Sequence, residues 1–315
     1  MLENFIFSVS CALPIFNVMI IGYFLKRKNM IDESFVEKAN ALVFNIALPI
    51  KLFNDVNQTS FQDSFDPKFI IFIVSGTIMS VVVLWILGLF IVQDKSQLGA
   101  FIHGAFRGNF LYIGLSLMEN ITGSIGVKAP LAIAFIIPLY NILAVIILSC
   151  TPSTEKVKVS IASILKKIVT NPLIIAVLLG ALVSQIGITM PMVMTRTMSY
   201  FEAVATPLAL IAIGASFSLA KSTENLKVSL LATSLKLILI PLSMVSIAML
   251  LGFNTEDIML TYVLFGVPSA TVSYVMTAAM NGDKDLASNI IMTTTLLSNF
   301  TMTLFIFAFK TLGII

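Results

Sequence analysis

The 315-residue chain is 58% hydrophobic and only 11% charged, and its mean hydropathy is +1.00. Soluble domains carry about 25% charged residues, so this composition excludes an ordinary soluble protein. The net charge of +3 reflects lysines in short loops and requires no nucleic-acid partner. Cys11 and Cys150 fall in apolar runs and the chain has one histidine, so we expect no disulfide, no metal site and no cofactor.

Hydropathy predicts ten membrane-spanning helices, each near the roughly 20 residues that a bilayer requires. The first half supplies spans at 5–25, 36–53, 69–92, 100–118 and 129–149, and the second at 164–186, 194–219, 228–251, 258–280 and 286–309. The short connections leave no room for a soluble domain. The sequence therefore predicts an all-α integral protein of the cell membrane with many passes.

Lysine and arginine positions orient these spans. If the N-terminus is outside, the outer loops hold only Lys51, Lys68, Lys128 and Lys310. The inner loops then hold Lys26, Arg27, Lys28, Lys38, Lys95, Lys156, Lys158, Lys166, Lys167, Lys221, Lys227 and Lys284. Since cytoplasmic loops are enriched in positive charge, we expect both termini outside.

The chain also repeats at an offset of 158 residues. Pro14 and Gly22 recur as Pro172 and Gly180. The further pairs are Pro49 with Pro207 and Gly108 with Gly266. Five spans per half is an odd number, so the second copy must enter the membrane from the opposite face. We therefore expect a first five-helix repeat at 1–150, a cytoplasmic linker at 151–163, and an inverted repeat at 164–315. Inverted repeats are typical of transporters, whose substrate site lies at the repeat interface.

Spans four and nine contain signals that interrupt a helix. Span four carries several glycines beside polar residues, and span nine contains a Gly-Val-Pro-Ser sequence at 266–269. Backbone that leaves the helix at this depth must be buried in protein or line a wet cavity. We predict two broken helices that cross near the midplane and direct the positive ends of half-helices at an anion. The predicted substrate-binding residues are Arg107, Gly108, Asn109, Pro268, Ser269, Thr271 and Ser273, and the predicted hinge or crossover residues are Pro49, Gly114, Pro207 and Gly266.

Three charged residues lie within predicted spans, where charge is costly. Arg107 could bind a substrate carboxylate, cap free carbonyls or pair with Glu202. Glu202 could carry a coupling proton, or neutralise Arg107 or Lys236. For Lys236 we expect a structural ion pair, with a coupling role as the alternative. His103 is expected at the membrane interface, with a proton relay as the alternative.

Four segments resemble the auxin efflux carrier family, which includes plant auxin carriers and bacterial malate or malonate permeases. They are Asn-Pro-Leu-Ile at 171–174, Thr-Pro-Leu-Ala-Leu-Ile-Ala-Ile-Gly-Ala at 206–215, Lys-Leu at 236–237 with Pro241, and Gly-Val-Pro-Ser-Ala at 266–270. The resemblance implies ten spans in two inverted repeats with broken helices four and nine. Ser116 replaces the family's crossover proline, while Asn109 is kept. This implies a reshaped pocket in which Asn109 still contacts the ligand.

These observations predict a secondary transporter, or permease, and not an enzyme. It would move a small organic anion, a carboxylate such as malate or malonate, by alternating access. Its partners would be that anion, the lipid bilayer, a coupling proton or sodium ion, and a second copy in a homodimer. The alternatives are a sodium-coupled symporter of the bile-acid type, with Asn109, Ser269 and Thr271 in the cation site, a membrane-embedded enzyme, or a channel.

Overall fold

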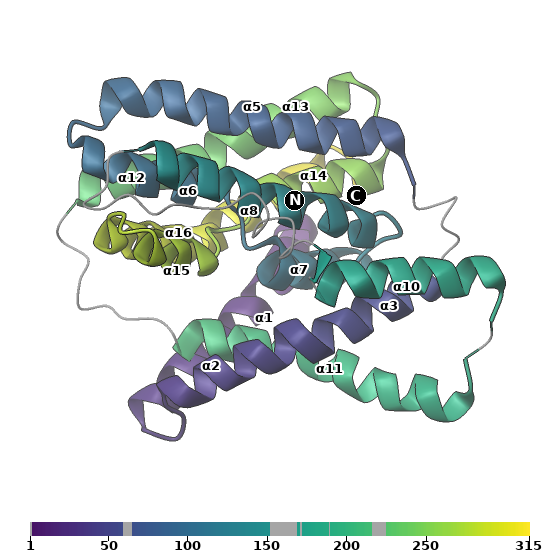
Figure 1. The fold of residues 1–315 in the computed structure, drawn as a ribbon. Helices are drawn as coiled ribbons and strands as arrows, with labels where there is room; N and C mark the ends of the chain where they lie inside the picture. Colours follow the sequence, from purple (N-terminus) through teal and green to yellow (C-terminus); the bar gives the residue numbers. More distant parts are fainter. Residues whose placement is uncertain (1, 59–64, 152–168, 171, 189, 216–224) are drawn as a thin grey trace.

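The computed structural model describes residues 2–58, 65–151, 169–170, 172–188, 190–215 and 225–315 (Figure 1). Nearly all of the expected linker at 151–163, and the residue Asn171, lie outside these ranges. All named elements of the described part are helical. An isolated bridge between Gly108 and Ser269 adds the one extended pairing in this part of the chain.

One group of helices, which we call the panel lobe, forms the lower part of Figure 1. It consists of α1 (Leu2–Arg27), α2 (Glu33–Leu42), the π-helix η1 (Val43–Ala47), α3 (Leu48–Gln58), α10 (Pro172–Ile186) and α11 (Met192–Ala215). Helix α1 packs on α11, and α3 packs on α10. Pro14 and Pro207 lie inside α1 and α11, while Pro172 is the first residue of α10.

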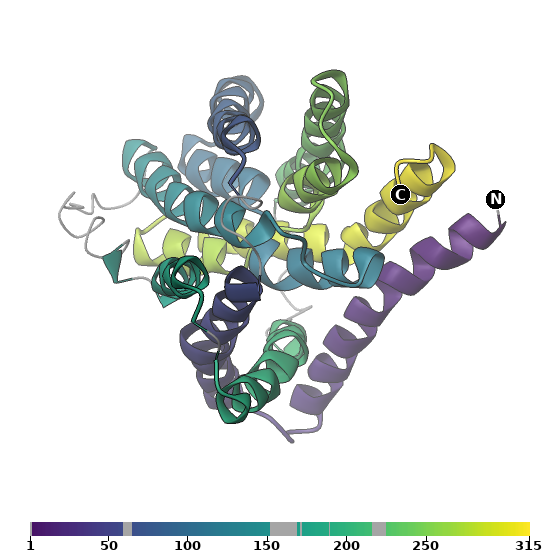
Figure 2. The same ribbon diagram turned by 90° about the vertical axis from the view of Figure 1, so that its right-hand side faces the viewer.

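The remaining helices form the bundle lobe above it. They are α5 (Pro67–Ile91), the 3₁₀ turn η2 (Lys95–Gln97), α6 (Leu98–Phe106), the π-helix η3 (Phe110–Gly114), α7 (Leu115–Thr122), α8 (Ala129–Cys150), α12 (Leu226–Ser234), the π-helix η5 (Leu235–Leu239), α13 (Ile240–Leu250), α14 (Thr255–Gly266), α15 (Val272–Ala279) and α16 (Lys284–Thr311). In Figure 2, α1 runs along the right-hand edge of the molecule, and both chain ends lie on that side. The Asn4 amide donates to the Thr311 hydroxyl there, at 3.4 Å.

Among the described residues, six helical segments are long and apolar enough to cross a membrane. They are α1, α5, α8, α11, α16 and the continuous segment Leu226–Leu250. Large apolar side chains on their outer faces are open to the surroundings, such as Phe90 at 84% and Leu250 at 86% exposure. Apolar surface of this extent suits contact with lipid chains. The chain is therefore an all-α, multi-pass membrane protein.

Prolines explain two of the π-helices. Pro49 follows η1 and Pro241 follows η5, each by two residues. A proline ring clashes with the carbonyl four residues earlier, which here belongs to the middle residue of each π-helix, Asn45 or Leu237. The wider π turn accommodates that carbonyl, so the helix continues past the proline. Pro49 and Pro241 thus mark bulges within continuous helices.

Candidate functional site

Two interrupted helices meet in the bundle lobe. Helix α6 ends at Phe106 and the helical path resumes at Phe110, while α14 ends at Gly266 and α15 begins at Val272. The Asn109 backbone N–H donates to the Pro268 carbonyl at 2.7 Å, and the Ala270 N–H donates to the Arg107 carbonyl at 3.1 Å. The two breaks therefore cross as a short antiparallel pair and satisfy each other's buried backbone groups. We call residues 107–109 and 267–271 the crossover.

Small residues allow this close approach. A methyl group on Gly108 would stand 2.9 Å from the Leu264 carbonyl oxygen and 3.0 Å from the Lys236 Nζ atom. The Ser269 hydroxyl donates to the Gly104 carbonyl at 2.5 Å, and the Ser269 N–H donates to the Thr294 hydroxyl at 3.2 Å. Gly108 and Ser269 thus fix the crossing geometry, and the Ser269 hydroxyl is already committed to it.

Lys236 connects the ends of both broken helices. Its side chain is completely buried, and its Nζ atom donates to the Phe265 carbonyl at 2.9 Å and to the Phe106 carbonyl at 3.5 Å. These carbonyls belong to the last turns of α14 and α6, where the helix dipole is negative. The expected ion pair of Lys236 is therefore wrong for the described part of the chain. The lysine charge is balanced by two helix C-termini.

Arg107, the first residue after α6, points into the bundle lobe. Its Nη2 atom donates to the Asn141 side-chain oxygen at 2.9 Å, and its Nη1 atom lies 3.2 Å from the Met276 sulfur. The guanidinium carbon lies 5.8 Å from the centre of the Tyr140 ring, within cation–π range. Arg107 is 5% exposed, and its fork of five donors has groups left over for an anion.

Glu202 does not neutralise either buried cation. It lies on α11 in the panel lobe, and its carboxylate accepts a hydrogen bond from the Asn54 amide on α3. No ion pair of Glu202 with Arg107 or Lys236 occurs among the described residues. The expected neutralisation fails because the carboxylate and the two cations belong to different lobes.

His103 lies inside the protein and not at the membrane interface as expected. It has no exposed surface, stacks on Phe106, and its Nδ1 atom lies 3.4 Å from the Thr277 hydroxyl. The Nε2 atom of His103 and the hydroxyl of Ser273 are buried without a hydrogen-bond partner. His103 belongs to α6 and Ser273 to α15, the two helices that flank the crossover.

The sequence analysis did not predict Asn141 and Thr277 as site residues. Asn141 is a polar residue inside the apolar span of α8, and this pattern is a signal that indicates it.

The remaining predicted residues surround the same point. Asn109 is 5% exposed and precedes η3, but its side chain does not cap that helix. Thr271 is half-buried just before α15. Gly114 packs against Val263 of α14, where an added methyl group would stand 2.9 Å from the Val263 side chain. Pro49 and Pro207 belong to the panel lobe, in α3 and α11.

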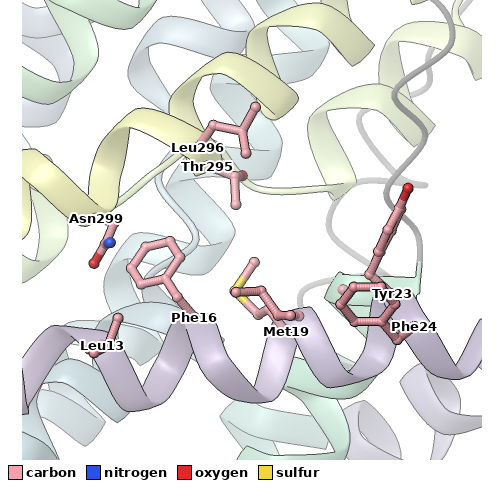
Figure 3. Close-up of a pocket in the computed structure, with 10 residues that line it drawn as sticks. Leu13, Phe16, Met19, Tyr23, Phe24, Thr295, Leu296 and Asn299 are labelled. Carbon is pink, nitrogen blue, oxygen red and sulfur yellow. The ribbon is translucent and has the colours of Figure 1, made fainter.

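A cavity of about 410 Å³ lies elsewhere, between α1, α11 and α16 (Figure 3). Its lining in the described part of the chain consists of Leu13, Phe16, Met19, Ile20, Tyr23, Phe24, Gly214, Thr295, Leu296 and Asn299. This set contains none of the residues predicted to bind substrate. Clusters of three or more metal-binding side chains are not found in the described ranges.

Comparison with known proteins identifies the family. The model of a family described as membrane transport protein matches residues 7–306. The chain belongs to the auxin efflux carrier family of membrane transport proteins. The crossover segments of this transporter lie well inside the matched region.

Individual relatives cover nearly the whole chain. The uncharacterized transporter YfdV of Escherichia coli (strain K12) is 24% identical over 291 residues, which is 87% of this chain and 89% of the relative. An uncharacterized transporter of Methanothermobacter thermautotrophicus is 24% identical, over 93% of this chain and 96% of the relative. A Rhizobium meliloti protein named "Putative malonate transporter" is 25% identical, over 93% and 92%. These relatives are transporters by name, in agreement with the family match, which together with the six apolar helices makes the chain a multi-pass membrane transporter.

Proposed function

We propose that this chain is a secondary transporter that moves a small carboxylate, such as malonate or malate, by alternating access. The observation that carries the proposal is the crossover. It brings the N-terminal ends of η3 and α15 together with a cation, Arg107, and an uncommitted amide, Asn109. Helix N-termini favour anions, and a guanidinium fork matches a carboxylate.

The neutral groups nearby support a carboxylate and not a cation. Ser273 holds a buried hydroxyl without a partner, and Thr271 is half-buried beside it. Glu202, which was predicted to carry a coupling proton or to neutralise Arg107 or Lys236, belongs to the other lobe. The malonate named for the Rhizobium meliloti relative is a substrate of the same chemical class. Pro268 would hold the second break open, with Gly266 and Gly114 as pivots of the two broken helices.

The experiment is calorimetric titration of the purified transporter with malonate, malate and acetate. We expect Asn109→Ala to weaken binding of all three. We expect Arg107→Gln to weaken the dicarboxylates more than acetate, because a lost charge-assisted hydrogen bond corresponds to roughly ten- to a hundredfold in affinity. Arg196→Gln, at an exposed arginine of the panel lobe, is the matched control. If the affinity for all three carboxylates is unchanged in both crossover variants, the substrate does not bind at the crossover.

We also propose that ten spans form two inverted repeats, 1–150 and 164–315. Adding 158 to the bounds of α2–α3, 33–58, gives 191–216, and α11 is Met192–Ala215. The same shift takes α5, 67–91, to 225–249, and the segment α12–α13 is Leu226–Leu250. The contacts between helices show the same offset. Gly22 approaches the carbonyl of Ile211. The repeat mate of Gly22 is Gly180, and it approaches the carbonyl of Phe53, which is the repeat mate of Ile211. This exchange of partners is what a pseudo-twofold relation between halves requires, and it supports the inverted repeat.

Both termini would lie outside. In a chain without native cysteines, a cysteine at Asn29 should be protected from an impermeant thiol reagent in intact cells, and a cysteine at Thr255 should react. The reverse labelling pattern would show that both termini lie inside.

The coupling proton is tested by measuring substrate uptake by the Glu202→Gln variant at several pH values. If uptake by this variant no longer depends on pH, the coupling proton is assigned to Glu202. Lys236 is the second coupling candidate, and its two carbonyl partners favour a structural role.

A further inference from the structure

The cavity between α1, α11 and α16 is a groove that opens sideways. Figure 3 shows Leu13, Phe16, Met19, Tyr23 and Phe24 along one helix, facing Thr295, Leu296 and Asn299 on another. Several lining side chains are about half exposed: Ile20 at 50%, Phe24 at 54% and Leu296 at 51%. In a protein that crosses a membrane, apolar side chains that are exposed on membrane-spanning helices contact the acyl chains of lipids. The groove is therefore accessible from the lipid.

The length of the groove fits one leaflet. Its lining runs along α1 from Leu13 to Phe24. Eleven residues of α-helix rise about 16 Å, which is close to half of the ~30 Å hydrocarbon core. A lipid chain from the leaflet at the C-terminal end of α1 could therefore lie along the groove.

Positive charge stands beside the groove at the C-terminal end of α1. Lys26 and Arg27 form the last turn of α1, and Lys28 follows. Lys26 is paired with Glu33. Arg27 is exposed, and its Nη1 atom donates to the Tyr23 hydroxyl at 3.3 Å, with the guanidinium 5.8 Å from the centre of the same ring. Tyr23 lines the groove, so it holds the guanidinium beside the groove. Lys28 is exposed beside it.

We propose that this groove binds an acyl chain of an anionic phospholipid, with the lipid phosphate held by Arg27 and Lys28. The apolar lining favours the chain and disfavours a small hydrophilic carboxylate, and the Thr295 hydroxyl is already bonded to the Ile291 carbonyl at 2.7 Å. The two exposed cations favour a negative headgroup over a zwitterionic one. This inference depends on the chain being a membrane protein and not on which substrate it carries.

The bound lipid would join the two lobes. Helices α1 and α11 belong to the panel lobe and α16 belongs to the bundle lobe. A ligand that contacts both lobes in one arrangement stabilises that arrangement by its binding free energy. We therefore expect anionic lipid to raise the melting temperature of the protein as well as to bind.

The test uses the transporter purified in detergent. Its melting temperature is measured with and without added lipid, and lipid binding is measured by native mass spectrometry. The probes are phosphatidylglycerol, phosphatidylcholine with the same chains, and water-soluble glycerol phosphate. Phosphatidylglycerol should stabilise most, and glycerol phosphate should have no effect. Arg27→Gln with Lys28→Gln should weaken phosphatidylglycerol binding roughly thirtyfold, leaving phosphatidylcholine binding unchanged. Leu296→Trp, which fills the groove from an exposed position, should weaken the binding of both lipids.

Two control variants keep the proposal falsifiable. Lys227→Gln removes an exposed lysine, and Ile86→Trp enlarges a residue that is 51% exposed on α5, a helix outside the groove. Neither should change lipid binding. Equal stabilisation by the two phospholipids in the wild type would overturn the proposal. So would equal losses in the control variants, or stabilisation by glycerol phosphate alone.

Discussion

Helix α1 crosses α11 at a distance that only glycine permits. A methyl group on Gly22 would overlap the Ile211 carbonyl oxygen and would stand 2.9 Å from the Ile211 Cα atom. A methyl group on Gly214 would overlap the Met19 carbonyl oxygen and stand 2.8 Å from the Met19 Cα atom. Carbon atoms in contact are separated by about 3.5–4.0 Å, so either alanine must push the helices apart by roughly 1 Å. Overpacking of this kind costs about 1–3 kcal/mol.

A matched glycine separates backbone contact from side-chain contact. A methyl group on Gly76 would overlap Met244 about as severely, but its neighbour is the terminal Cε atom of a flexible side chain that can move aside. We expect Gly22→Ala and Gly214→Ala to lower the melting temperature of the detergent-purified protein clearly, and Gly76→Ala to lower it little. Gly180→Ala, at the repeat mate, should also destabilise, because its methyl group would stand 2.7 Å from the Phe53 carbonyl oxygen. Equal effects of Gly22→Ala and Gly76→Ala would refute the reasoning that backbone proximity sets the cost.

Three further outcomes are expected. Lys236→Met should lower the melting temperature, since two helix C-termini lose a charged hydrogen-bond donor worth roughly 1.5–3 kcal/mol; unchanged melting would mean that the lysine is dispensable. Lys51→Glu should destabilise the protein and Glu119→Lys in the same chain should restore it, because the two side chains form an ion pair between the lobes; the lack of recovery would argue against the pair. Hydrogen bonding to Lys128 lowers the pKa of Asp66 below its usual 3.8, so its stabilising contribution is complete above about pH 4 and is lost as pH falls through the lower folded value. Melting curves between pH 3 and 6 should therefore be less pH-dependent in Asp66→Asn than in the wild type.

The sequence was sufficient to predict the crossover because its signals are local. Glycine and proline weaken a helix at their own positions, and the two interruptions, at Gly108 and at 266–268, do lie against each other. The partners of Lys236 could not be predicted in the same way. They are backbone carbonyls, which every residue carries, so no sequence pattern distinguishes the two that lie nearby. Glu202 was expected to neutralise Arg107 or Lys236 because pairing opposite charges from the sequence alone does not show which lobe each residue belongs to.

Helix continuity was harder to predict for a related reason. Only six segments of the described chain have the length and apolarity of an uninterrupted span. The crossover helices are too short to count because their breaks divide them. The segment 33–58 continues through its π-helix, but it is less apolar and contains the charged residues Glu33, Glu37, Lys38, Lys51 and Asp55. A proline in the sequence does not tell whether the helix ends, kinks or widens, since that depends on which carbonyls the neighbouring helices can satisfy. Pro14 and Pro207 stay inside long helices, whereas Pro268 lies in a break.

The polar links between the lobes gather at one end of the molecule, in the part that the structure describes. Asn4 bonds to Thr311, the Asn120 amide donates to the Cys11 carbonyl at 2.8 Å, and Lys51 pairs with Glu119. These contacts involve the N-terminal half of α1, the last residue of α16, and the helices α3 and α7. The lipid groove lies instead along the C-terminal half of α1. Alternating access requires one end of the interface between lobes to be closed while the other can open. The side-chain polar links between the lobes thus lie toward the end of the molecule that carries both termini.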